Sequence, residues 1–451
     1  MTNLPIALKL ITSNILFKDE VAAILAAALR AADPFDAVTC NLSVVGDILT
    51  IGGKKYSRTP EGRIVVVALG KAAPAMLEGA FSKLGGLIQR GVCVSKHPVE
   101  AGERVRGIDY VQGNHPVPGD GSLAAGRAIK ETVVGLTEHD LVLVLLSGGG
   151  SALATLPVEG VTLVDMQELT STLLRSGADI NQMNAVRKHL DVIKGGGLLR
   201  LAAPASVSTL VLSDVVGNHL DVIASGPTYP DTTTFTQALE VVKRAHVSGD
   251  IPVTILEYLE KGTKGQVPET VRPGNALAVN VNHTIIGSNL ESCQAAVQKA
   301  REFSFYAELV TTNLVGEARE AGQSLAEIAK ERLDLPRPYV LVFGGETTVT
   351  ITGSGKGGRN QEVALGALKG MAGQSGTVLI TLATDGEDGP TDAAGAVVDG
   401  TSLTRANRLG LDSDAYLVNN DAYTFFKQMR DLLVIGPTGT NVNDISFIFG
   451  F

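Results

Sequence analysis

The sequence predicts an α/β protein of two domains, the first containing a mostly parallel sheet with helices on both faces. Three observations support this fold class. The chain has 451 residues, which is too many for one hydrophobic core. Continuous apolar runs, such as IVVVAL at 64–69, are typical of strands buried on both faces. Helical stretches separate these runs, as the crossover connections of a parallel sheet require.

The elements of the first domain follow this alternation in order. A helix over 19–32 is expected to stop at Asp33-Pro34, because proline cannot continue it. A hairpin with a Gly52-Gly53 turn comes next. Further strands are expected at 64–69, 141–146 and 207–212, and helices near 72–84, 120–136, 162–176 and 179–193. Ligands of such sheets bind at the carboxyl ends of the strands, so residues just after these runs are candidate site residues.

The domain boundary is expected after residue 262, where a segment rich in Gly, Pro and charge lacks apolar periodicity. This gives an N-terminal domain over 1–262 and a C-terminal domain over 263–451. In the second domain, strands are expected at 283–287, 306–310, 339–343, 348–352, 378–383 and 445–449, the last as a closing strand. Helices are expected near 289–302, 316–332 and 360–368.

Composition and net charge limit the kinds of partner that the protein is expected to bind. The net charge of −9 and the pI of about 5.4 argue against a surface that binds nucleic acid or an anionic membrane. The three cysteines lie far apart, which disfavours a disulfide framework or structural zinc and is consistent with the cytoplasm. The first 20 residues are expected to form an amphipathic segment rather than a signal peptide. No apolar run reaches the length of a membrane span.

A glycine-rich loop at Gly353–Gly358 fits the pattern G-x-G-x-x-G before a helical stretch. Three interpretations are open: a dinucleotide-binding turn, a phosphate cradle of loop N–H groups at a helix N-terminus, or a plain turn with solvated charges. Lys356 and Arg359 favour the phosphate cradle, because such a density of cations is unusual in a dinucleotide turn.

An acidic turn follows the strand expected at 378–383. Its carboxylates, Asp385, Glu387 and Asp388, have a spacing that allows them to converge on Mg²⁺. The alternative is a simple Asx-turn, in which a carboxylate accepts hydrogen bonds from nearby backbone. Together, the cationic and acidic loops indicate phosphoryl transfer.

Further candidates lie at strand ends in the first domain. Lys71 begins a helix, where a lysine is unfavourable with the helix dipole unless it meets an anion. The loop Ser147-Gly148-Gly149-Gly150-Ser151 is either an anion cradle or a tight turn, and Lys194 with the glycines after it is a similar case. Asp214 is either a metal ligand or proton acceptor, or a turn residue. His115 is a loop histidine that either contacts a ligand or is structural.

Motifs of several other enzyme classes are missing from the sequence. No segment has the P-loop pattern G-x-x-x-x-G-K-[ST], and the catalytic loop of protein kinases is also missing. The Ser147–Ser151 loop is not G-x-S-x-G, so a hydrolase nucleophile is poorly supported.

Eight ordered runs resemble the glycerate 2-kinase family, whose C-terminal module is called MOFRL. The runs are ALGKAA (68–73), NHPVPGD (114–120), LLSGGGSALATLP (145–157), MNAVRKHLDVIKGGGL (183–198), LSDVVGNHLDVIASGPT (212–228), VFGGETTVTITGSGKGGRNQE (342–362), ATDGEDGPTDAAGA (383–396) and GPTGTNVNDI (436–445). They cover nearly the whole chain, which makes the resemblance specific as a set. One difference is Asn218, where the family more often has Asp.

The resemblance implies a Rossmann-like first domain, a second α/β domain with the MOFRL module at about 338–445, and an active site in the cleft between them. It implies transfer of the γ-phosphoryl group of ATP to the 2-hydroxyl of D-glycerate, with Mg²⁺. By motif, it makes Lys71 and Arg359 the catalytic cations. Asp214, Asp385 and Asp388 are candidates for binding Mg²⁺ or for accepting the hydroxyl proton, and we expect Asp214 among the catalytic residues and Asp385 and Asp388 as metal ligands. The residues expected to bind substrate or phosphate are Ser147, Gly148, Gly149, Gly150, Ser151, Lys194, Gly345, Glu346, Gly355, Lys356, Gly358 and Asn360.

Two other functions are kept as alternatives. An NAD(P)-dependent hydroxypyruvate reductase is consistent with the G-x-G-x-x-G pattern, and related sequences carry that name. A non-catalytic sensor of nucleotide or sugar acid is the third hypothesis. The expected partners are small molecules, with no nucleic acid and no membrane, and a homo-oligomer is left open.

Overall fold

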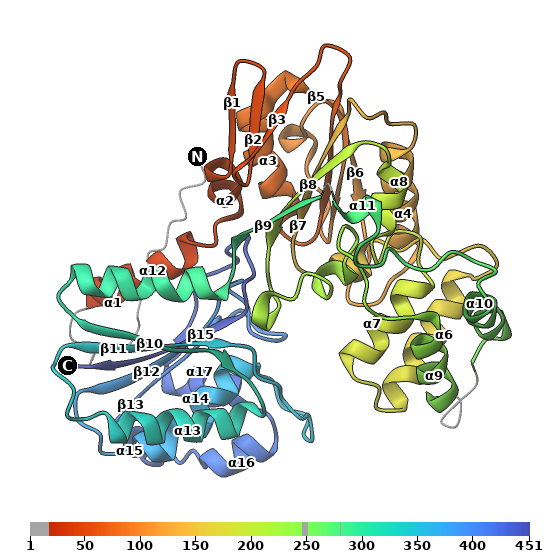
Figure 1. Cartoon of the computed structure of the whole chain (residues 1–451). Helices are drawn as coiled ribbons and strands as arrows, with labels where there is room; N and C mark the ends of the chain where they lie inside the picture. Colours follow the sequence, from red (N-terminus) through yellow and green to blue (C-terminus); the bar gives the residue numbers. More distant parts are fainter. Residues whose placement is uncertain (1–17, 246–250, 280) are drawn as a thin grey trace. The chain divides into compact units, whose positions relative to one another are not determined.

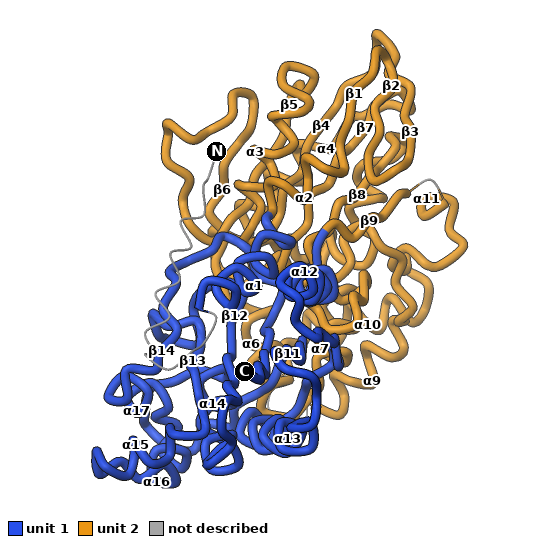
Figure 2. Tube along the Cα trace, turned by 90° about the vertical axis from the view of Figure 1, so that its left-hand side faces the viewer, with its two compact units in different colours: residues 1–33, 287–451 blue, residues 34–286 orange. Residues whose placement is uncertain are grey.

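The computed structural model describes residues 18–245, 251–279 and 281–451, so most of the amphipathic segment expected at the N-terminus lies outside the described residues. The chain forms two compact units (Figure 2). Unit 2 contains residues 34–286, and unit 1 contains residues 18–33 together with 287–451. The boundary expected after residue 262 therefore falls inside unit 2.

Unit 2 is built on a six-stranded sheet. Its strands are β4 Ile64–Leu69, β5 Ile88–Ser95, β6 Ile108–Gln112, β7 Leu141–Leu146, β8 Ser206–Leu212 and β9 Asn282–Gly287. They lie in the order β6-β5-β4-β7-β8-β9, and the pairs from β6 to β8 are parallel. Strands β4 and β7 are buried along their whole length, which confirms the prediction from their apolar runs.

Helices cover both faces of this sheet, as predicted. Helices α4 (Asp120–Val133) and α8 (Gly197–Ala202) share one core with Val65 and Val67. Side chains alternate along a strand, so Val66 and Ala68 face the opposite side, where α3 (Ala73–Leu84) contacts β4 and β5.

Smaller groups complete unit 2. An antiparallel sheet is formed by β1 (Leu42–Val45), β2 (Ile48–Ile51) and β3 (Lys54–Ser57), with the predicted glycine turn between β2 and β3. A separate apolar core is shared by α6 (Leu163–Arg175), α7 (Ile180–His189), α9 (Phe235–Ala245) and α10 (Val253–Thr263). The shorter helices are α2 Pro34–Cys40, α5 Gly150–Leu153 and α11 Ala276–Val279.

Unit 1 has a second six-stranded sheet. Its strands are β10 Tyr306–Leu314, β11 Tyr339–Gly345, β12 Thr377–Ala383, β13 Gly395–Asp399, β14 Leu432–Leu433 and β15 Asp444–Gly450. Their order is β10-β11-β15-β12-β13-β14. The run expected as a closing strand, β15, thus lies in the middle of the sheet, antiparallel to both β11 and β12.

Helices also cover both faces of the sheet of unit 1 (Figure 1). On one face α1 (Lys18–Arg30) and α12 (Asn289–Glu302) pack against Val340 and Val342 of β11. On the other face α13 (Ala318–Glu331), α14 (Arg359–Met371) and α17 (Ala422–Met429) pack against Leu341 and Phe343. The packing of α1 in this core explains why residues 18–33 belong to unit 1. The remaining helices are α15 Ser402–Arg408 and α16 Ser413–Val418.

Two expected elements differ in the structure. Strand β9, expected in the second domain, belongs to the sheet of unit 2, and the boundary between the units follows it. Residues 348–352, expected as a strand, form only an isolated bridge between Thr348 and Glu317. The backbone N–H of Thr350 donates to the Glu317 carboxylate instead of to a neighbouring strand, with distances of 3.2 and 3.3 Å to its two oxygens.

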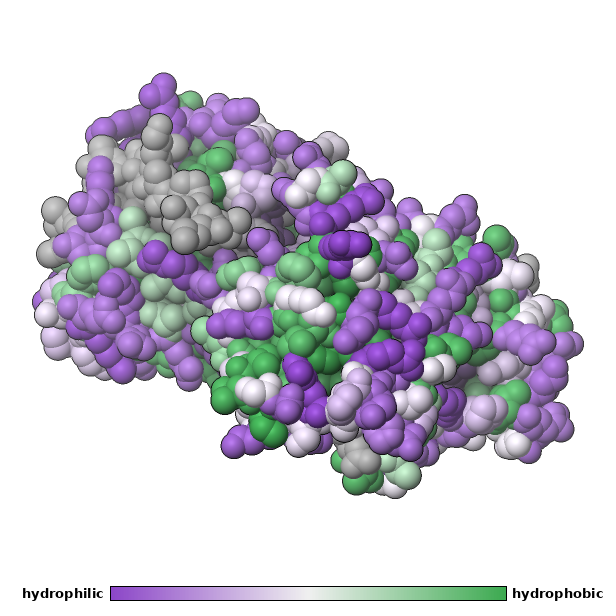
Figure 3. Space-filling model, turned by 90° about the horizontal axis from the view of Figure 1, so that it is seen from above, coloured by the Kyte–Doolittle hydropathy of each residue, from purple (hydrophilic) through white to green (hydrophobic). Residues whose placement is uncertain are grey.

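Over the part of the chain that the structure describes, every helix is too short or too polar to cross a membrane. Hydrophilic residues cover much of the face seen in Figure 3, and hydrophobic residues adjoin one another near its middle.

Candidate active site

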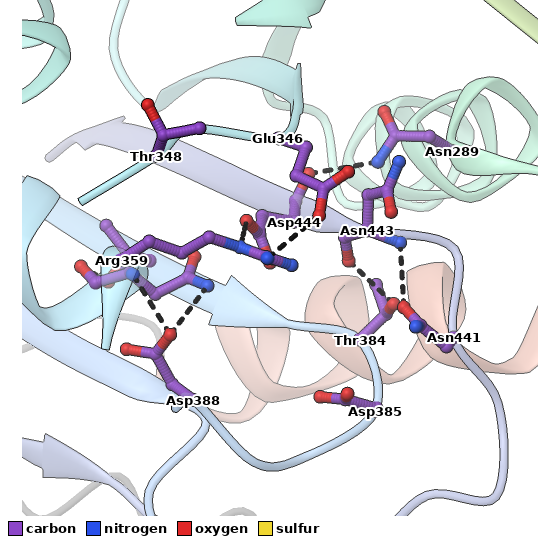
Figure 4. Close-up of polar contacts among 12 residues, drawn as sticks. Asn289, Glu346, Thr348, Arg359, Thr384, Asp385, Asp388, Asn441, Asn443 and Asp444 are labelled. Atoms are coloured by element: carbon purple, nitrogen blue, oxygen red, sulfur yellow. Dashed lines mark hydrogen bonds and ion pairs between the residues drawn. The ribbon is translucent and has the colours of Figure 1, made fainter. Parts of the chain in front are cut away.

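Arg359, the first residue of α14, lies in a network of carboxylates in unit 1 (Figure 4). Its Nε lies 2.5 Å from Asp444 Oδ2 and its Nη2 lies 3.2 Å from Asp444 Oδ1. Its Nη1 donates to Glu346 Oε1 at 2.8 Å. These contacts use three of the five N–H groups of a guanidinium, and the other two donate to no residue that the structure describes. The Arg359 side chain is 33% exposed, so a ligand can reach those N–H groups.

The sheet topology brings Asp444 to this position. Asp444 begins β15, and its backbone is in register with Gly345 at the end of β11 and with Ala383 at the end of β12. The start of an antiparallel central strand therefore lies at the same edge as the carboxyl ends of its neighbours. Burial by itself lowers the pKa of Arg359, but the charges and hydrogen bonds of Asp444, with Glu346, raise it above the ordinary value. Arg359 is consequently a permanent, fixed cation.

Asp388, predicted as a metal ligand, caps the N-terminus of α14. Its carboxylate accepts from the backbone N–H groups of Asn360 at 3.2 Å and of Gln361 at 2.8 Å. The side chain of Asn360 also donates to it, at 3.4 Å, and is itself buried. Burial, together with the nearby Asp444, raises the pKa of Asp388 to about 7. A carboxyl group with this environment fits a helix cap better than a metal ligand, and Asn360 stabilises the cap.

The backbone N–H groups from Gly353 to Lys356 are not open to phosphate. The N–H of Gly353 donates to Asn420 Oδ1 at 2.9 Å, and those of Ser354 and Gly355 donate to Asn419 at 3.1 and 2.9 Å. The N–H of Lys356 donates to Asp421 Oδ1 at 3.0 Å. These four N–H groups, which a phosphate cradle or a dinucleotide turn could use, thus donate within the chain. For this part of the loop the plain-turn interpretation fits the structure best.

The glycines of this loop are explained by close packing. A Cβ on Gly355 would lie 2.4 Å from the Cβ of Asp421, and one on Gly358 would lie 2.2 Å from Asp388 Cγ. The exposed Lys356 extends its Nζ over the ring of Tyr423, 4.6 Å from the centroid. Lys356 is the loop residue whose charge is accessible to a ligand.

The other predicted residues of unit 1 have mixed environments. Gly345 ends β11 with φ 154°, and a Cβ there would lie 2.2 Å from the carbonyl oxygen of Leu314. Glu346 is a partner of Arg359. Asp385 is half-buried, and its Oδ1 accepts from the N–H of Glu387 at 3.2 Å, the geometry of an Asx-turn.

The predicted Mg²⁺ site has few protein ligands. No group of three or more His, Cys, Asp or Glu side chains is arranged for a metal within 18–245, 251–279 and 281–451. Mg²⁺ is commonly held by one or two carboxylates together with substrate phosphates and water. Asp385 fits that more limited role, whereas Asp388 does not.

In unit 2, Lys71 and the Ser147–Ser151 loop lie together at the carboxyl ends of β4 and β7. The N–H of Lys71 donates to the carbonyl oxygen of Gly148 at 2.9 Å, and the N–H of Ala72 donates to Ser147 Oγ at 3.1 Å. Gly149 has φ 81°, which glycine adopts without strain. The backbone N–H groups from Gly148 to Ser151 donate to no acceptor in the described chain, in contrast to those of the loop in unit 1.

His115 and Asp214 border the same loop. A Cβ on Gly149 would lie 3.3 Å from Lys71 Cγ and 3.2 Å from His115 Cδ2, so these two side chains flank the glycine. Burial, and the charges of Lys71 and Lys96, lower the pKa of His115. A Cβ on Gly148 would lie 1.8 Å from Asp214 Oδ2, which places that carboxylate directly against the loop. The structure therefore brings Lys71, the glycine loop and Asp214 together, as predicted.

Lys194, predicted to bind phosphate, is instead buried in an ion pair. Its Nζ lies 2.5 Å from Asp191 Oδ2 and 3.1 Å from the carbonyl oxygen of Ala154. Asp191 also accepts from Thr155 Oγ1 at 2.6 Å. The Lys194 side chain is 3% exposed, so the ammonium group stabilises the local fold and does not face a ligand.

Sequence reasoning missed Asp444 and the residues that fix it. Asn289 Nδ2 donates to the carbonyl oxygen of Asp444 at 2.9 Å, and Asn443 accepts from Thr384 Oγ1 at 2.6 Å. Asp444 and Asn443 lie in a run that resembles the family, GPTGTNVNDI, which was the one available signal. Their role depends on the central position of β15, which the sequence does not indicate. Asn218 has φ 56°, a conformation that asparagine tolerates.

The class of protein defined by these observations is a two-domain α/β protein with cations and carboxylates at the sheet edges of both units. Residues 20–260 match the model of a domain of unknown function, DUF4147, and residues 339–444 match the MOFRL family. The chain belongs to the glycerate 2-kinase family, as the resemblance predicts.

Three similar proteins illustrate the relationship. The D-glycerate 2-kinase of Thermotoga maritima is 44% identical over 85% of this chain and 89% of its own length. A crystal structure of glycerate kinase from Thermotoga maritima has a TM-score of 0.84 at 40% identity, covering 96% of this chain and 99% of that one. A putative hydroxypyruvate reductase of Agrobacterium vitis is 39% identical over 94% of this chain and 92% of its own length.

Proposed function

We propose that this protein is a glycerate 2-kinase, which transfers the γ-phosphoryl group of ATP to the 2-hydroxyl of D-glycerate. The observation that carries the proposal is the fixed guanidinium of Arg359, which has two N–H groups that donate to no described residue and can bind a phosphoryl group. Phosphoryl transfer depends mainly on positioning and on neutralisation of charge, which fixed cations supply. The names of the similar proteins support the same substrate.

In the proposed reaction, the 2-hydroxyl oxygen of glycerate forms a bond to the γ-phosphorus of ATP. The bond from that phosphorus to the β,γ-bridging oxygen breaks, and its electron pair leaves with ADP. The hydroxyl proton passes to a carboxylate, for which Asp214 beside Gly148 is the candidate. Lys71 and Arg359 neutralise the charge of the phosphoryl group. The expectation that the substrates meet in a cleft between the domains stays a prediction.

Mg²⁺, when bound with ATP, neutralises charge on the β- and γ-phosphates. Asp385 is the proposed protein ligand, while Asp388 caps α14. The exposed Lys356 is proposed to attract the nucleotide by its charge, without help from the loop backbone.

The reductase alternative is less well supported. It rests on the G-x-G-x-x-G pattern and on the names of two relatives from Agrobacterium vitis. A dinucleotide turn uses glycine N–H groups and a helix N-terminus to bind pyrophosphate. Here Asn419, Asn420, Asp421 and Asp388 already accept from those donors. A sensor without turnover would bind glycerate and ATP but release no ADP.

ADP release from ATP, Mg²⁺ and D-glycerate tests the proposal, with NADH and hydroxypyruvate in a parallel reaction. The kinase predicts glycerate-dependent ADP release and no oxidation of NADH. Oxidation of NADH without ADP release would replace the kinase by the reductase, and binding without either reaction would indicate the sensor.

A further inference from the structure

Three consecutive basic residues lie near the end of α7. Two of them contact carboxylates, and the third has no partner among the described residues. Lys188 Nζ lies 3.3 Å from Asp231 Oδ1 and 3.4 Å from Asp221 Oδ2. His189 Nε2 lies 2.8 Å from Glu269 Oε1. The side chain of Arg187 makes no hydrogen bond, ion pair or ring contact with any described residue.

The environment of Arg187 makes this lack of a partner costly. The residue is only partly exposed, and burial lowers its pKa. A cation that is removed from water without a counter-charge destabilises the protein, so such groups are normally paired. An anionic ligand that binds here would supply the missing charge.

The helix face that carries Arg187 is connected to the Ser147–Ser151 loop. Asn184, which is buried, lies three residues before Arg187, so the two are neighbours along one side of α7. Asn184 Oδ1 accepts from Ser225 Oγ at 3.2 Å, and Ser225 Oγ lies 2.8 Å from Ser151 Oγ. A chain of three hydrogen-bonding side chains therefore connects α7 to the loop.

Ser225 is held in this chain at some conformational cost. Ala224 and Ser225 have φ values of 50° and 59°, in the left-handed region that is unfavourable for residues other than glycine. Strain of this kind persists where the surrounding structure fixes it, and it is concentrated at functional sites. Here the hydrogen bonds of Ser225 to Asn184 and Ser151 help to hold it in this conformation.

The charges around the loop favour a small anion with one negative charge. Lys71 and His115 flank Gly149, and the carboxylate of Asp214 lies against Gly148. Asp214 would repel a polyphosphate placed directly on the loop more strongly than a single carboxylate. A guanidinium binds a carboxylate through two parallel N–H groups, which also fixes its orientation.

We infer that Arg187 binds the carboxylate of the acceptor substrate and thereby selects a hydroxy acid over a neutral polyol. This inference rests on the proposed function, because it assigns the group that holds D-glycerate during transfer. Arg187 thereby contributes to substrate affinity, while Lys71 and Arg359 act on the phosphoryl group.

Steady-state kinetics of Arg187→Gln and Arg187→Lys test the inference. Loss of a charged hydrogen-bond pair should raise KM for D-glycerate about 10- to 100-fold and leave KM for ATP within about twofold. Activity with glycerol, which lacks the carboxylate, should not fall in Arg187→Gln. Free guanidinium ion should restore part of the activity of Arg187→Ala. The matched control is Arg127→Gln, an exposed arginine on α4, which should leave every constant unchanged.

The outcomes separate this inference from the proposed function. An unchanged KM for glycerate in a folded Arg187→Gln protein, or a raised KM for ATP alone, would overturn the inference and leave the kinase standing. If the wild-type protein shows no turnover, calorimetric titration with D-glycerate measures binding directly. Binding by the wild type and none by the variant would then support Arg187 and reject the kinase, whereas no binding by the wild type would reject both. Because Arg187 has no partner among the described residues, its substitution should not lower the melting temperature of the protein. Arg187→Lys provides a second folded variant for the same measurements.

Discussion

Arg359 Nε lies 2.5 Å from Asp444 Oδ2, and this contact joins the first residue of α14 to the first residue of β15. The two residues are 85 positions apart in the sequence. Asp444 therefore fixes the direction of the Arg359 side chain, and the remaining N–H groups are those proposed to bind a phosphoryl group. The predictions below follow from this relationship and from the comparison of buried with exposed residues.

Asp444→Asn should lower kcat by at least about tenfold, because it removes the charge that orients Arg359. Asp444 is a positioning residue, so KM for ATP and glycerate should change less than kcat. The matched control is Asp414→Asn, which removes an exposed ion pair with Lys369, also at 2.5 Å. Equal effects of the two substitutions on kcat would contradict the assigned role.

Lys71→Ala should lower turnover by about a hundredfold or more while leaving the fold intact. The Lys71 side chain is exposed, so its removal should change the free energy of unfolding by less than about 0.5 kcal/mol. Lys55→Ala, an exposed lysine on β3, is the control for both measurements. Near-normal turnover of Lys71→Ala would remove this lysine from the site.

Lys194→Met should destabilise unit 2 by about 3–5 kcal/mol, because Asp191 would remain buried without its partner. Urea denaturation measures the change. The matched control is Lys299→Met, since Lys299 pairs with Glu302 at the same i,i+3 spacing on an exposed helix. That loss should be about 1 kcal/mol or less. If the Lys194→Met protein were stable but bound phosphate weakly, the prediction from the sequence that Lys194 binds phosphate would stand.

Gly355→Ala should destabilise unit 1 by about 1–3 kcal/mol, because the new methyl group would meet Asp421. Gly102→Ala is the control, since no heavy atom lies within 4 Å of its added Cβ. Chemical denaturation of both variants measures the difference. A destabilised Gly102→Ala protein and an unchanged Gly355→Ala protein would contradict the packing described for the loop.

Asp388→Asn should change how stability depends on pH. The pKa of Asp388 is about 7 in the folded chain and 3.8 for an ordinary aspartate. From about pH 4 to about pH 7 the unfolded wild type binds fewer protons than the folded protein, so its unfolding free energy falls as pH rises. Asparagine does not titrate. The unfolding free energy of the variant should therefore rise relative to that of the wild type as pH rises over this range, by roughly 1.4 kcal/mol per unit of pKa difference. A stability difference that is constant between about pH 4.5 and about pH 8 would show that Asp388 titrates normally.

Much of the fold could be predicted because strands that are buried on both faces have continuous apolar sequences. The runs at 64–69 and 141–146 match β4 and β7 residue for residue, since both faces of these strands are buried. The run at 348–352 misled because its valine and isoleucine alternate with threonine, as in a half-buried strand. In the structure Thr352 donates to Asn420, a partner 68 residues away, so no neighbouring strand is available to it.

The sequence predicted the candidate site residues that follow parallel strands of unit 2, but it did not predict Asp444. Lys71, the Ser147–Ser151 loop and Asp214 end strands of one parallel sheet, so the rule for ligand edges brought them together correctly. Asp444 begins an antiparallel strand, whose place between β11 and β12 is a long-range property. The loop N–H groups at Gly353–Gly358 were misjudged because their acceptors at 419–421 lie far along the chain.

The most direct test of the central claim is the phosphorus NMR spectrum of the product formed from D-glycerate, ATP and Mg²⁺. A glycerate 2-kinase predicts a new phosphoester signal split into a doublet by the single proton on C2. A triplet from the two protons on C3 would show phosphorylation of the other hydroxyl, and no new phosphoester signal would contradict a glycerate kinase altogether.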